Sequence, residues 1–280
     1  MFKQTGCYTM RLVNRIFVIS FNAMHFGVKN KPSNDPASIS LIFRWLDEQL
    51  EYARRQELTA LLVYHIPHGE FLTPVGTEVF WVPTHEEKFR QLLSRYRATI
   101  GGIYTGHLHF SALNSTKRFS TRDLVDWEMT RLYDYDYYGP EIVNRAVSPL
   151  FDNNPGFTLF YYTDTMEYPK YYEEYTFPLT VTYNKTAPPD DYWVYLYSSL
   201  KDLGIKNLSA RSMYEFMDTL YDDYRKFFKY MMWRLGRTLY EPDAIESIME
   251  AVCGSYSNDL PAYSMCIDSL KSYIKEGLTH

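Results

Sequence analysis

The stretch Ile100-Gly-Gly-Ile-Tyr-Thr-Gly-His-Leu-His109 joins an expected strand to two histidines one residue apart. Ile100 to Thr105 reads as a buried strand that leads directly to His107. Side chains at positions i and i+2 of an extended chain point to the same face, about 7 Å apart at their bases. His107 and His109 could therefore present two imidazoles to one metal-binding pocket, and Gly106 would leave room for them.

The preceding elements place a third histidine beside this pair. Residues 60–64 predict a buried strand that ends at His65, and residues 84–97 predict the helix that follows it. Strand, helix and strand in this order are typical of an α/β fold, in which sites form outside the carboxyl edge of the sheet. A single histidine at a strand end is more often packed than metal-bound, but three at one edge favour a metal site.

The rest of the chain predicts further strands first and mostly helices later. The expected extended segments are Tyr8–Val13 and Arg15–Asn22, which form a hairpin around Asn14, and then Val143–Pro149, Gly156–Thr163 and Tyr171–Tyr183. The expected helices are Ile42–Leu50, Ser212–Leu235, Pro242–Val252 and Asp259–Lys275. Capping boxes at Thr84–Glu87 and Ser212–Glu215 are expected to begin two of the helices.

Composition narrows the class of protein. The 280 residues are 46% hydrophobic with a net charge of -5, so the chain can bury a core but lacks the clustered basic residues of a nucleic-acid surface. Aromatic residues make up 18% of the chain, which favours packing and leaves a sugar-, nucleotide- or lipid-contacting surface as the alternative. The apolar run Ile16–Phe26 is too short to cross a bilayer, and we interpret it as a strand rather than a signal peptide.

The cysteines and the glycosylation sequons favour an oxidising compartment. Cys253 and Cys266 are a candidate local disulfide, which would contribute about 3 kcal/mol, whereas Cys7 has no evident partner. No CxxC spacing indicates a structural zinc site. Candidate glycosylation sites begin at Asn114, Asn184 and Asn207. We therefore expect a secreted protein or one of the lysosomal and secretory pathway, although the sequence shows no export signal.

The order of motifs resembles a known family. Tyr64-His-Ile-Pro67 with Gly69, followed by GHLH, resembles the GHIPPG and GHTH motifs of calcineurin-like metallophosphoesterases, in particular the acid sphingomyelinase-like branch. Phe43–Leu50 is similar to the WLEEQL helix of that branch, and Asn153–Phe157 to its NPGY turn. The resemblance implies an α/β fold of the α+β sandwich type. Residues 1–165 would form the C-terminal half of the metallophosphoesterase domain, and residues 166–280 a small helical C-terminal subdomain.

The resemblance also implies a site and a reaction. His65 and His107 would share one divalent metal ion and His109 would bind a second, with zinc as the favoured metal. A metal-bound water would attack phosphorus, which makes the family hydrolases of phosphodiesters. The implied substrate is a phosphoester, either a sphingolipid or a nucleotide, with peripheral lipid contact and no transmembrane segment.

Several family features are missing from the sequence. It contains no DxH, GDxxD or GNH motif, and Met1 falls where the second half of the family begins, so the metal site is incomplete and no catalytic residue is assigned. Without bridging carboxylates, two neighbouring dications would repel strongly, so the chain alone is expected to be inactive or nearly so. Tyr64 replaces a glycine and His68 a proline of the motif, and His68 is expected to be a solvated loop residue rather than an extra ligand. Two interpretations remain: part of a phosphodiesterase, or a truncated non-catalytic binding protein derived from that family.

Overall fold

A computed structural model describes most of the chain. The described residues are 1–12, 15–29, 35–73, 76–117, 137–150, 153–163, 168–179, 192–220, 222–236, 245, 246, 248–250, 252, 253 and 260–277. The expected turn at Asn14, the sequon at Asn184 and most of the expected helix at 242–252 lie outside them.

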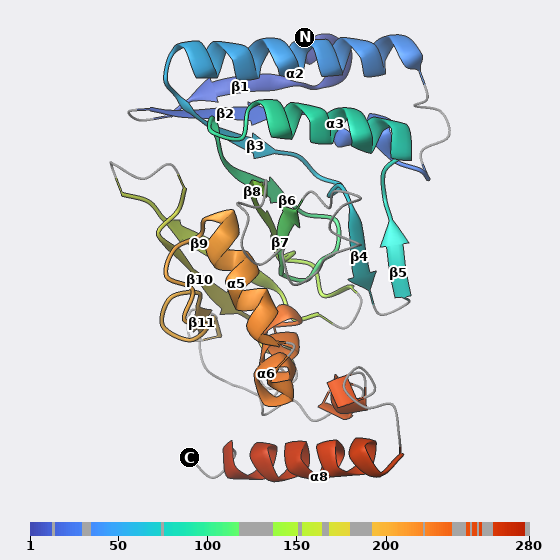
Figure 1. Ribbon diagram of the computed structural model, residues 1–280, viewed down its shortest axis with the longest axis vertical. Helices are drawn as coiled ribbons and strands as arrows, with labels where there is room; N and C mark the ends of the chain where they lie inside the picture. The colour runs from blue at the N-terminus through green and yellow to red at the C-terminus, as the bar shows by residue number, and fades with distance from the viewer. Residues whose placement is uncertain are drawn as a thin grey trace, which may run out of the picture.

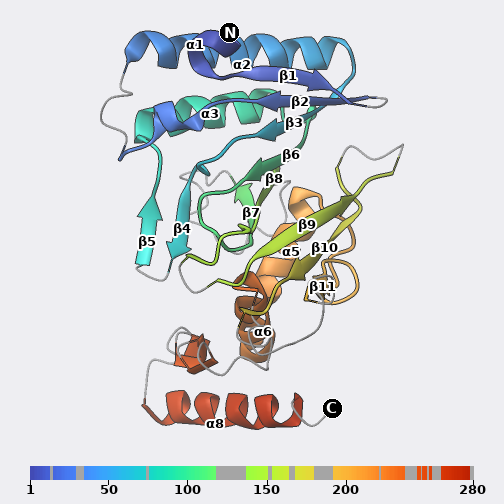
Figure 2. The same cartoon turned by 180° about the vertical axis from the view of Figure 1, so that it is seen from behind.

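A mixed six-stranded sheet, in the order β1-β2-β3-β6-β8-β7, lies at the centre of the larger part of the molecule (Figures 1 and 2). Its strands are β1 (Tyr8–Arg11), β2 (Ile16–Ser20), β3 (Thr59–Val63), β6 (Ile100–Thr105), β7 (Ala112–Lys117) and β8 (Tyr137–Val143). The four inner strands run parallel and the two edge strands run antiparallel to their neighbours. The predicted hairpin and both predicted buried strands, 60–64 and 100–105, are confirmed within a residue or two.

Two helices, α2 (Pro36–Arg55) and α3 (Pro83–Arg95), cover one face of this sheet (Figure 1). Asp35 caps α2 by accepting hydrogen bonds from the backbone N–H groups of Ala37 and Ser38. The apolar side of α2 faces the core. α3 begins at Pro83 after Val82, which supplies no side-chain cap, so the predicted capping box at Thr84 is wrong. Proline at the first helical position fixes the entry conformation that a capping side chain would otherwise support.

Several short elements accompany the sheet and its helices. They are α1 (Phe2–Thr5), the 3-10 helix η1 (Ala23–Phe26) and the hairpin formed by β4 (Glu70–Thr73) and β5 (Gly76–Val79), which the sequence did not predict. The predicted strand 143–149 is also wrong, because β8 ends at Val143. There the Asn144 side chain donates to the carbonyls of Thr105 and Ile142, and the chain leaves the sheet.

A second sheet packs beside the first. It is antiparallel, in the order β11-β10-β9, and is formed by β9 (Gly156–Tyr161), β10 (Tyr171–Thr176) and β11 (Val194–Ser198). One of its faces is covered by α5 (Ala210–Leu220), and α6 (Tyr224–Arg234) follows (Figures 1 and 2). Leu113 and Ile142 of the first sheet share a hydrophobic cluster with this second sheet and α5. The segment expected to be a helical subdomain from residue 166 therefore contains two of the three strands of a sheet as well as helices.

The single helix expected over residues 212–235 is two helices. α5 begins at Ala210, after Ser209, whose hydroxyl accepts a hydrogen bond from the N–H of Ser212. Asp223 then caps α6 by accepting from two backbone N–H groups, so the chain starts a new helix there. The predicted end at Gly236 is confirmed, and this glycine has a φ of 66°.

The C-terminal helix α8 (Leu260–Gly277) packs on α6 around the predicted disulfide. Cys253 and Cys266 are bonded, with Cα atoms 5.7 Å apart, and both lie in a third hydrophobic cluster with Phe228 and Met232 of α6. Cys7 is buried and forms no disulfide in the described part of the chain. Among the described helices, none is both long and apolar enough to cross a membrane.

Candidate functional site

The carboxyl ends of β3 and β6 meet at one edge of the six-stranded sheet, and a histidine follows each strand. The strands are parallel neighbours, with Leu62 opposite Ile103. Beyond the strand ends the Gly106 N–H donates to the His65 carbonyl at 2.9 Å. The imidazole rings of His65 and His107 have centroids 5.2 Å apart and planes at 81°. The structure therefore brings these two predicted residues together from separate loops.

The spacing of this pair is compatible with one metal ion. Zinc binds imidazole nitrogens at about 2.0–2.1 Å in tetrahedral geometry, which places two ring centroids about 5 Å apart. The observed separation of 5.2 Å agrees with that arrangement. His65 is exposed and His107 half-buried, with the Phe80 ring packed edge-on at 5.1 Å, so an ion could reach the pair from solvent.

His109 lies in the same loop as His107, and the expectation that it binds a second ion stays a prediction. The described residues contain no group of three or more His, Cys, Asp or Glu side chains that could hold a metal ion. His107 and His109 also adopt positive φ angles of 71° and 66°, so the expected extended geometry of GHLH is wrong. The alternation of side chains along a strand does not apply in such a tight loop.

Packing and hydrogen bonds hold this strained loop. Positive φ in residues other than glycine costs on the order of 1–3 kcal/mol and persists only where the surroundings impose it. The Leu108 N–H donates to the Gly106 carbonyl at 2.8 Å, and the Ala146 N–H donates to the His109 carbonyl at 3.3 Å. Leu108 and Phe110 are buried in the core. The fold thus holds the backbone conformation of the loop that carries His107.

His68 is buried, which corrects the expectation of a solvated loop residue. Its side chain and that of Glu141 are both 0% exposed, with His68 Nδ1 3.3 Å from the Glu141 carboxylate. The Tyr64 hydroxyl lies 2.8 Å from the same nitrogen. Burial, together with the Glu141 carboxylate, raises the pKa of Tyr64 well above its usual value, so its phenol is protonated. The ring of His68 also packs on Trp81 and Phe89.

These contacts tie Tyr64 and His68, the two positions at which the chain departs from the motif it resembles, to the Glu141 carboxylate. Together with Glu141 of β8 they form a buried polar group that fixes the loop after β3, on which His65 lies. The Trp81 indole N–H donates to the Ile66 carbonyl at 2.9 Å and holds the same loop. Sequence reasoning missed Glu141. Its position as a charged residue in the apolar end of β8 was the signal that could have revealed it.

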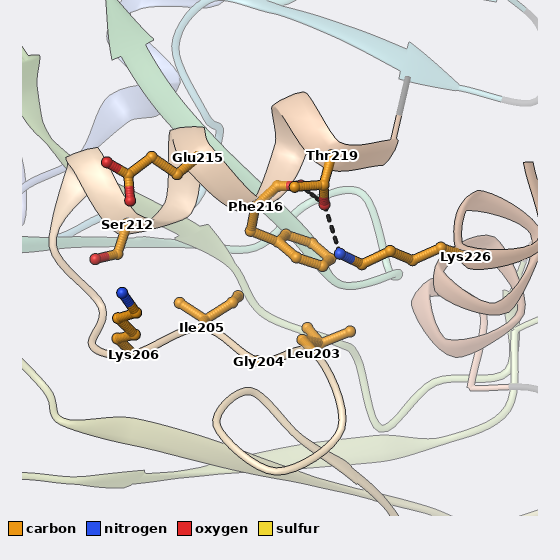
Figure 3. Close-up of a pocket in the computed structure, with 9 residues that line it drawn as sticks. All are labelled: Leu203, Gly204, Ile205, Lys206, Ser212, Glu215, Phe216, Thr219 and Lys226. Atoms are coloured by element: carbon orange, nitrogen blue, oxygen red, sulfur yellow. Dashed lines mark hydrogen bonds between the residues drawn. The ribbon is translucent and has the colours of Figure 1, made fainter. Parts of the chain in front are cut away.

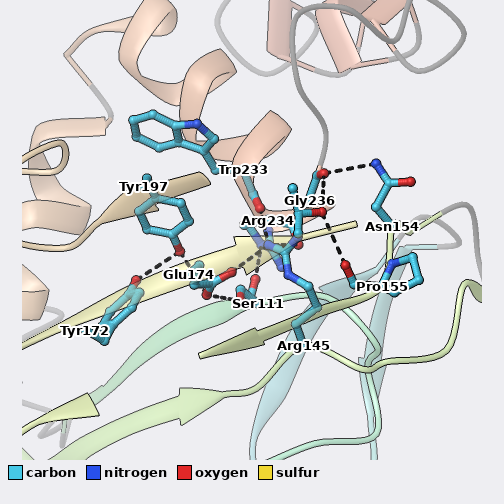
Figure 4. Close-up of polar contacts among 11 residues, drawn as sticks. Ser111, Arg145, Asn154, Pro155, Tyr172, Glu174, Tyr197, Trp233, Arg234 and Gly236 are labelled. Carbon is cyan, nitrogen blue, oxygen red and sulfur yellow. Dashed lines mark hydrogen bonds and ion pairs between the residues drawn. The ribbon is translucent and has the colours of Figure 1, made fainter. Parts of the chain in front are cut away.

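A second buried polar group lies beyond the GHLH loop (Figure 4). Arg145 donates to the Glu174 carboxylate at 2.6 Å, and the two side chains are 0% and 1% exposed. Glu174 also accepts hydrogen bonds from the hydroxyls of Ser111 and Tyr197. Arg145 donates in addition to the carbonyls of Trp233 and Arg234 at the end of α6. We call these residues the Arg145–Glu174 node.

The node joins the histidine loop to the second sheet and to α6. Ser111 lies two residues after His109. Its N–H donates to the Arg234 carbonyl at 3.0 Å, and its backbone carbonyl accepts from the Arg234 guanidinium at 3.1 Å. Gly156 of the NPGF turn and Gly236 both border the Arg145 side chain, and a Cβ at either position would collide with it. The resemblance of this turn to the family motif thus has a structural basis. The sequence did not identify Arg145 or Glu174, since nothing in YYEEYT separates a buried glutamate from an exposed one.

A hollow of about 140 Å³ lies elsewhere, between α5 and the loop that precedes it (Figure 3). Lys206 and Lys226 lie at its two ends, and Lys226 donates to the Thr219 hydroxyl at 2.5 Å. Its nine lining residues, all within the described chain, include no histidine, so it is not part of the His65–His107 site.

Two of the three predicted glycosylation sites lie within the described residues. The Asn207 side chain is half-buried and accepts a hydrogen bond from the Ser209 N–H at 3.1 Å. Asn114 lies within β7.

Comparison with known proteins gives distant relatives. No family model matches the chain. It is 26% identical over 162 residues to the sphingomyelinase phosphodiesterase D of Dictyostelium discoideum, covering 58% of this chain and 34% of the relative. It is 22% identical to the human acid sphingomyelinase-like phosphodiesterase 3b, covering 95% of this chain and 57% of the relative. It is 25% identical to a bovine cyclic GMP-AMP phosphodiesterase, covering 76% of this chain and 45% of the relative.

The chain spans from about a third to somewhat more than half of the length of these relatives. Two of these relatives carry names from, or belong by description with, the acid sphingomyelinase-like phosphodiesterases, the branch that the HIP, GHLH and NPGF motifs resemble. The chain is a distant homologue, at 22–26% identity, of acid sphingomyelinase-like phosphodiesterases.

Proposed function

We propose that the chain carries part of the metal centre of a phosphodiesterase of the acid sphingomyelinase-like type. His65 and His107 would bind one divalent ion, with zinc favoured, and His109 would bind its neighbour. The observation that supports this most is the 5.2 Å separation of the His65 and His107 rings at the carboxyl edge of parallel strands. Distant homology to proteins named for phosphodiester hydrolysis agrees with it.

The chemistry of the donor set limits what the chain does alone. Bound divalent cations lower the pKa of a coordinated water and so supply a nucleophile for attack on phosphorus. Two such ions need anionic ligands between them, and the 280 residues contain no DxH, GDxxD or GNH motif. We propose that these ligands come from a segment outside this sequence. The proposed substrate is a phosphodiester, either a sphingolipid such as sphingomyelin or a nucleotide such as cyclic GMP-AMP.

Turnover of a chromogenic phosphodiester in the presence of zinc tests this proposal. We expect the 280-residue chain to remain close to the uncatalysed rate, because imidazoles alone carry no charge to offset two dications. A longer chain that includes the three missing motifs should show zinc-dependent turnover that His107→Ala abolishes, while His85→Ala retains it. Zinc-dependent turnover by the 280 residues themselves, lost on His107→Ala, would contradict the expected inactivity. A longer chain whose turnover survives His107→Ala would contradict the proposed site.

A second candidate function is a non-catalytic binding protein. It is favoured by the absence of the three motifs and by the aromatic residues exposed on the second sheet. We also propose a secretory or lysosomal location, supported by the Cys253–Cys266 bond and by the sequons. Glycan on the Asn207 peptide in mass spectrometry would support that location, and an unmodified peptide with free Cys253 would count against it.

A further inference from the structure

The face of the second sheet that is turned away from α5 carries a ladder of aromatic side chains. Strand alternation places Tyr172, Glu174 and Thr176 of β10 on the buried side, and leaves Tyr171, Glu173 and Tyr175 on the other. Figure 2 shows that other side of β9 and β10, with α5 behind the strands. The aromatic face consists of Phe157, Tyr161, Tyr171, Tyr175, Trp193 and Tyr195.

The rings of this face contact one another across the strands. Phe157 stacks on Tyr175 with ring planes at 5°, and Tyr161 stacks on Tyr171 at 12°. Trp193 lies against Phe157 at 5.0 Å. Despite these contacts Phe157 and Trp193 are each 37% exposed and Tyr195 is 45% exposed. Leu159, 43% exposed, extends the apolar surface along β9, so several large apolar side chains face solvent together.

Carboxylates lie among these rings. Glu173, in the middle of β10, accepts hydrogen bonds from Tyr161 at 2.8 Å and Tyr175 at 3.4 Å. Asp202 accepts from the Tyr195 hydroxyl at 2.7 Å. The Glu173 carboxylate raises the pKa of Tyr161 to about 12, so this phenol stays a neutral donor. The faces of aromatic rings carry negative electrostatic potential. The rings therefore supply an apolar area, and the rings and carboxylates together attract cations to it.

A basic side chain borders the same surface. The Lys201 ammonium lies 3.9 Å from the Glu173 carboxylate, and its side chain is 71% exposed. At that distance and exposure the pair is weak and the ammonium can turn to another anion. The surface therefore offers an electron-rich apolar area with a cation at its border.

We propose that this aromatic face docks on a bilayer of choline phospholipids. A quaternary ammonium forms no hydrogen bonds and is bound by aromatic faces and nearby carboxylates, while the adjoining phosphate would pair with Lys201. Tyrosine and tryptophan favour the boundary between lipid and water, because each has an apolar ring and a polar group. The docking needs no metal and no hydrolysis, so it stands apart from the proposed phosphodiesterase site.

Sedimentation with vesicles, carried out with the whole chain in EDTA, tests this inference separately from the metal site. We expect binding to phosphatidylcholine vesicles, a blue shift of tryptophan emission, and binding at least about tenfold weaker for Trp193→Ser/Tyr195→Ser. Tyr52→Ser is the matched control, because Tyr52 on α2 is as exposed as Tyr195, at 45%. Its binding should equal that of the unaltered chain. Leu159→Ser provides a second variant on the face should the double variant unfold.

Phosphatidylethanolamine, which lacks the quaternary ammonium, should bind several times more weakly than phosphatidylcholine. Absence of binding to phosphatidylcholine would overturn the inference. Equal binding to phosphatidylethanolamine or to anionic vesicles would do so too, because it would indicate general apolar or charge attraction. A dimer in sedimentation velocity that Trp193→Ser/Tyr195→Ser dissociates would assign the face to a second copy of the chain and would also overturn the inference.

Discussion

Arg145→Met is expected to destabilise the protein by about 3–5 kcal/mol, because it leaves the Glu174 carboxylate buried without its cation. Glu174 is 1% exposed and, within the described part of the chain, would retain the hydroxyls of Ser111 and Tyr197 as its side-chain partners. The carbonyls of Trp233 and Arg234 would also lose a donor. Unfolding in urea, followed by circular dichroism and tryptophan fluorescence, should show a midpoint lowered by about 1–2 M.

A double variant separates the unpaired charge from lost packing. Arg145→Met/Glu174→Leu removes both charges, and apolar replacement of a buried ion pair is often neutral or stabilising. We expect it to be more stable than Arg145→Met alone. The described role of the node would be contradicted if Arg145→Met lost less than about 1 kcal/mol of unfolding free energy. It would also be contradicted if the change in the double variant equalled the sum of the changes in Arg145→Met and Glu174→Leu measured singly.

Loss of the Cys253–Cys266 bond should release the C-terminal helix while the sheets stay folded. A loop closed over 13 positions contributes about 3 kcal/mol by the chain-entropy estimate. The bond lies in the cluster that joins α8 to α6. This cluster shares no buried residue with the cluster around β3 and α2, although the partly buried Leu235 packs against both. We therefore expect amide exchange in α8 to accelerate about 100-fold in Cys253→Ser/Cys266→Ser, since this free energy corresponds to about two decades.

The amides of β3 provide the internal control, because their protection depends on the first cluster. Their exchange should be unchanged in Cys253→Ser/Cys266→Ser and in the reduced unaltered chain. Unaltered exchange in α8 would show that packing on α6 holds this helix without the bond. Acceleration in β3 equal to that in α8 would show that the clusters unfold as one unit, contrary to this expectation.

The parts of the fold that could be predicted are those with a strong local pattern. The apolar runs of β3 and β6 were identified because inner parallel strands are apolar on both faces. The order strand, helix, strand then predicted that His65 and His107 share an edge. Helix starts were predicted less well, because Pro83 and Ser209, rather than the capping boxes, set them.

Other features depend on contacts between distant segments. Glu174 is buried because Arg145, Ser111 and Tyr197 reach it from other elements, and the glutamate before it in the same strand remains on the outer face. His68 is buried because Glu141, 73 positions later, accompanies it inside the core (141 − 68). The positive φ angles of GHLH result from the packing of Leu108 and Phe110 and from the hydrogen bond of Ala146. None of these contacts leaves a periodic pattern in the sequence.

The central claim is that His65 and His107 bind one divalent ion between them, and zinc titration of the purified chain tests it most directly. Calorimetry should show a zinc site that weakens at least about tenfold in His65→Ala and in His107→Ala, because each substitution removes one of the two imidazole ligands. His85→Ala, which alters a half-buried histidine on α3, should bind as the unaltered chain does. X-ray absorption of the zinc complex should show two imidazole ligands in the unaltered chain and one in either variant. Zinc affinity and imidazole content that stay the same in His65→Ala and His107→Ala would contradict the claim.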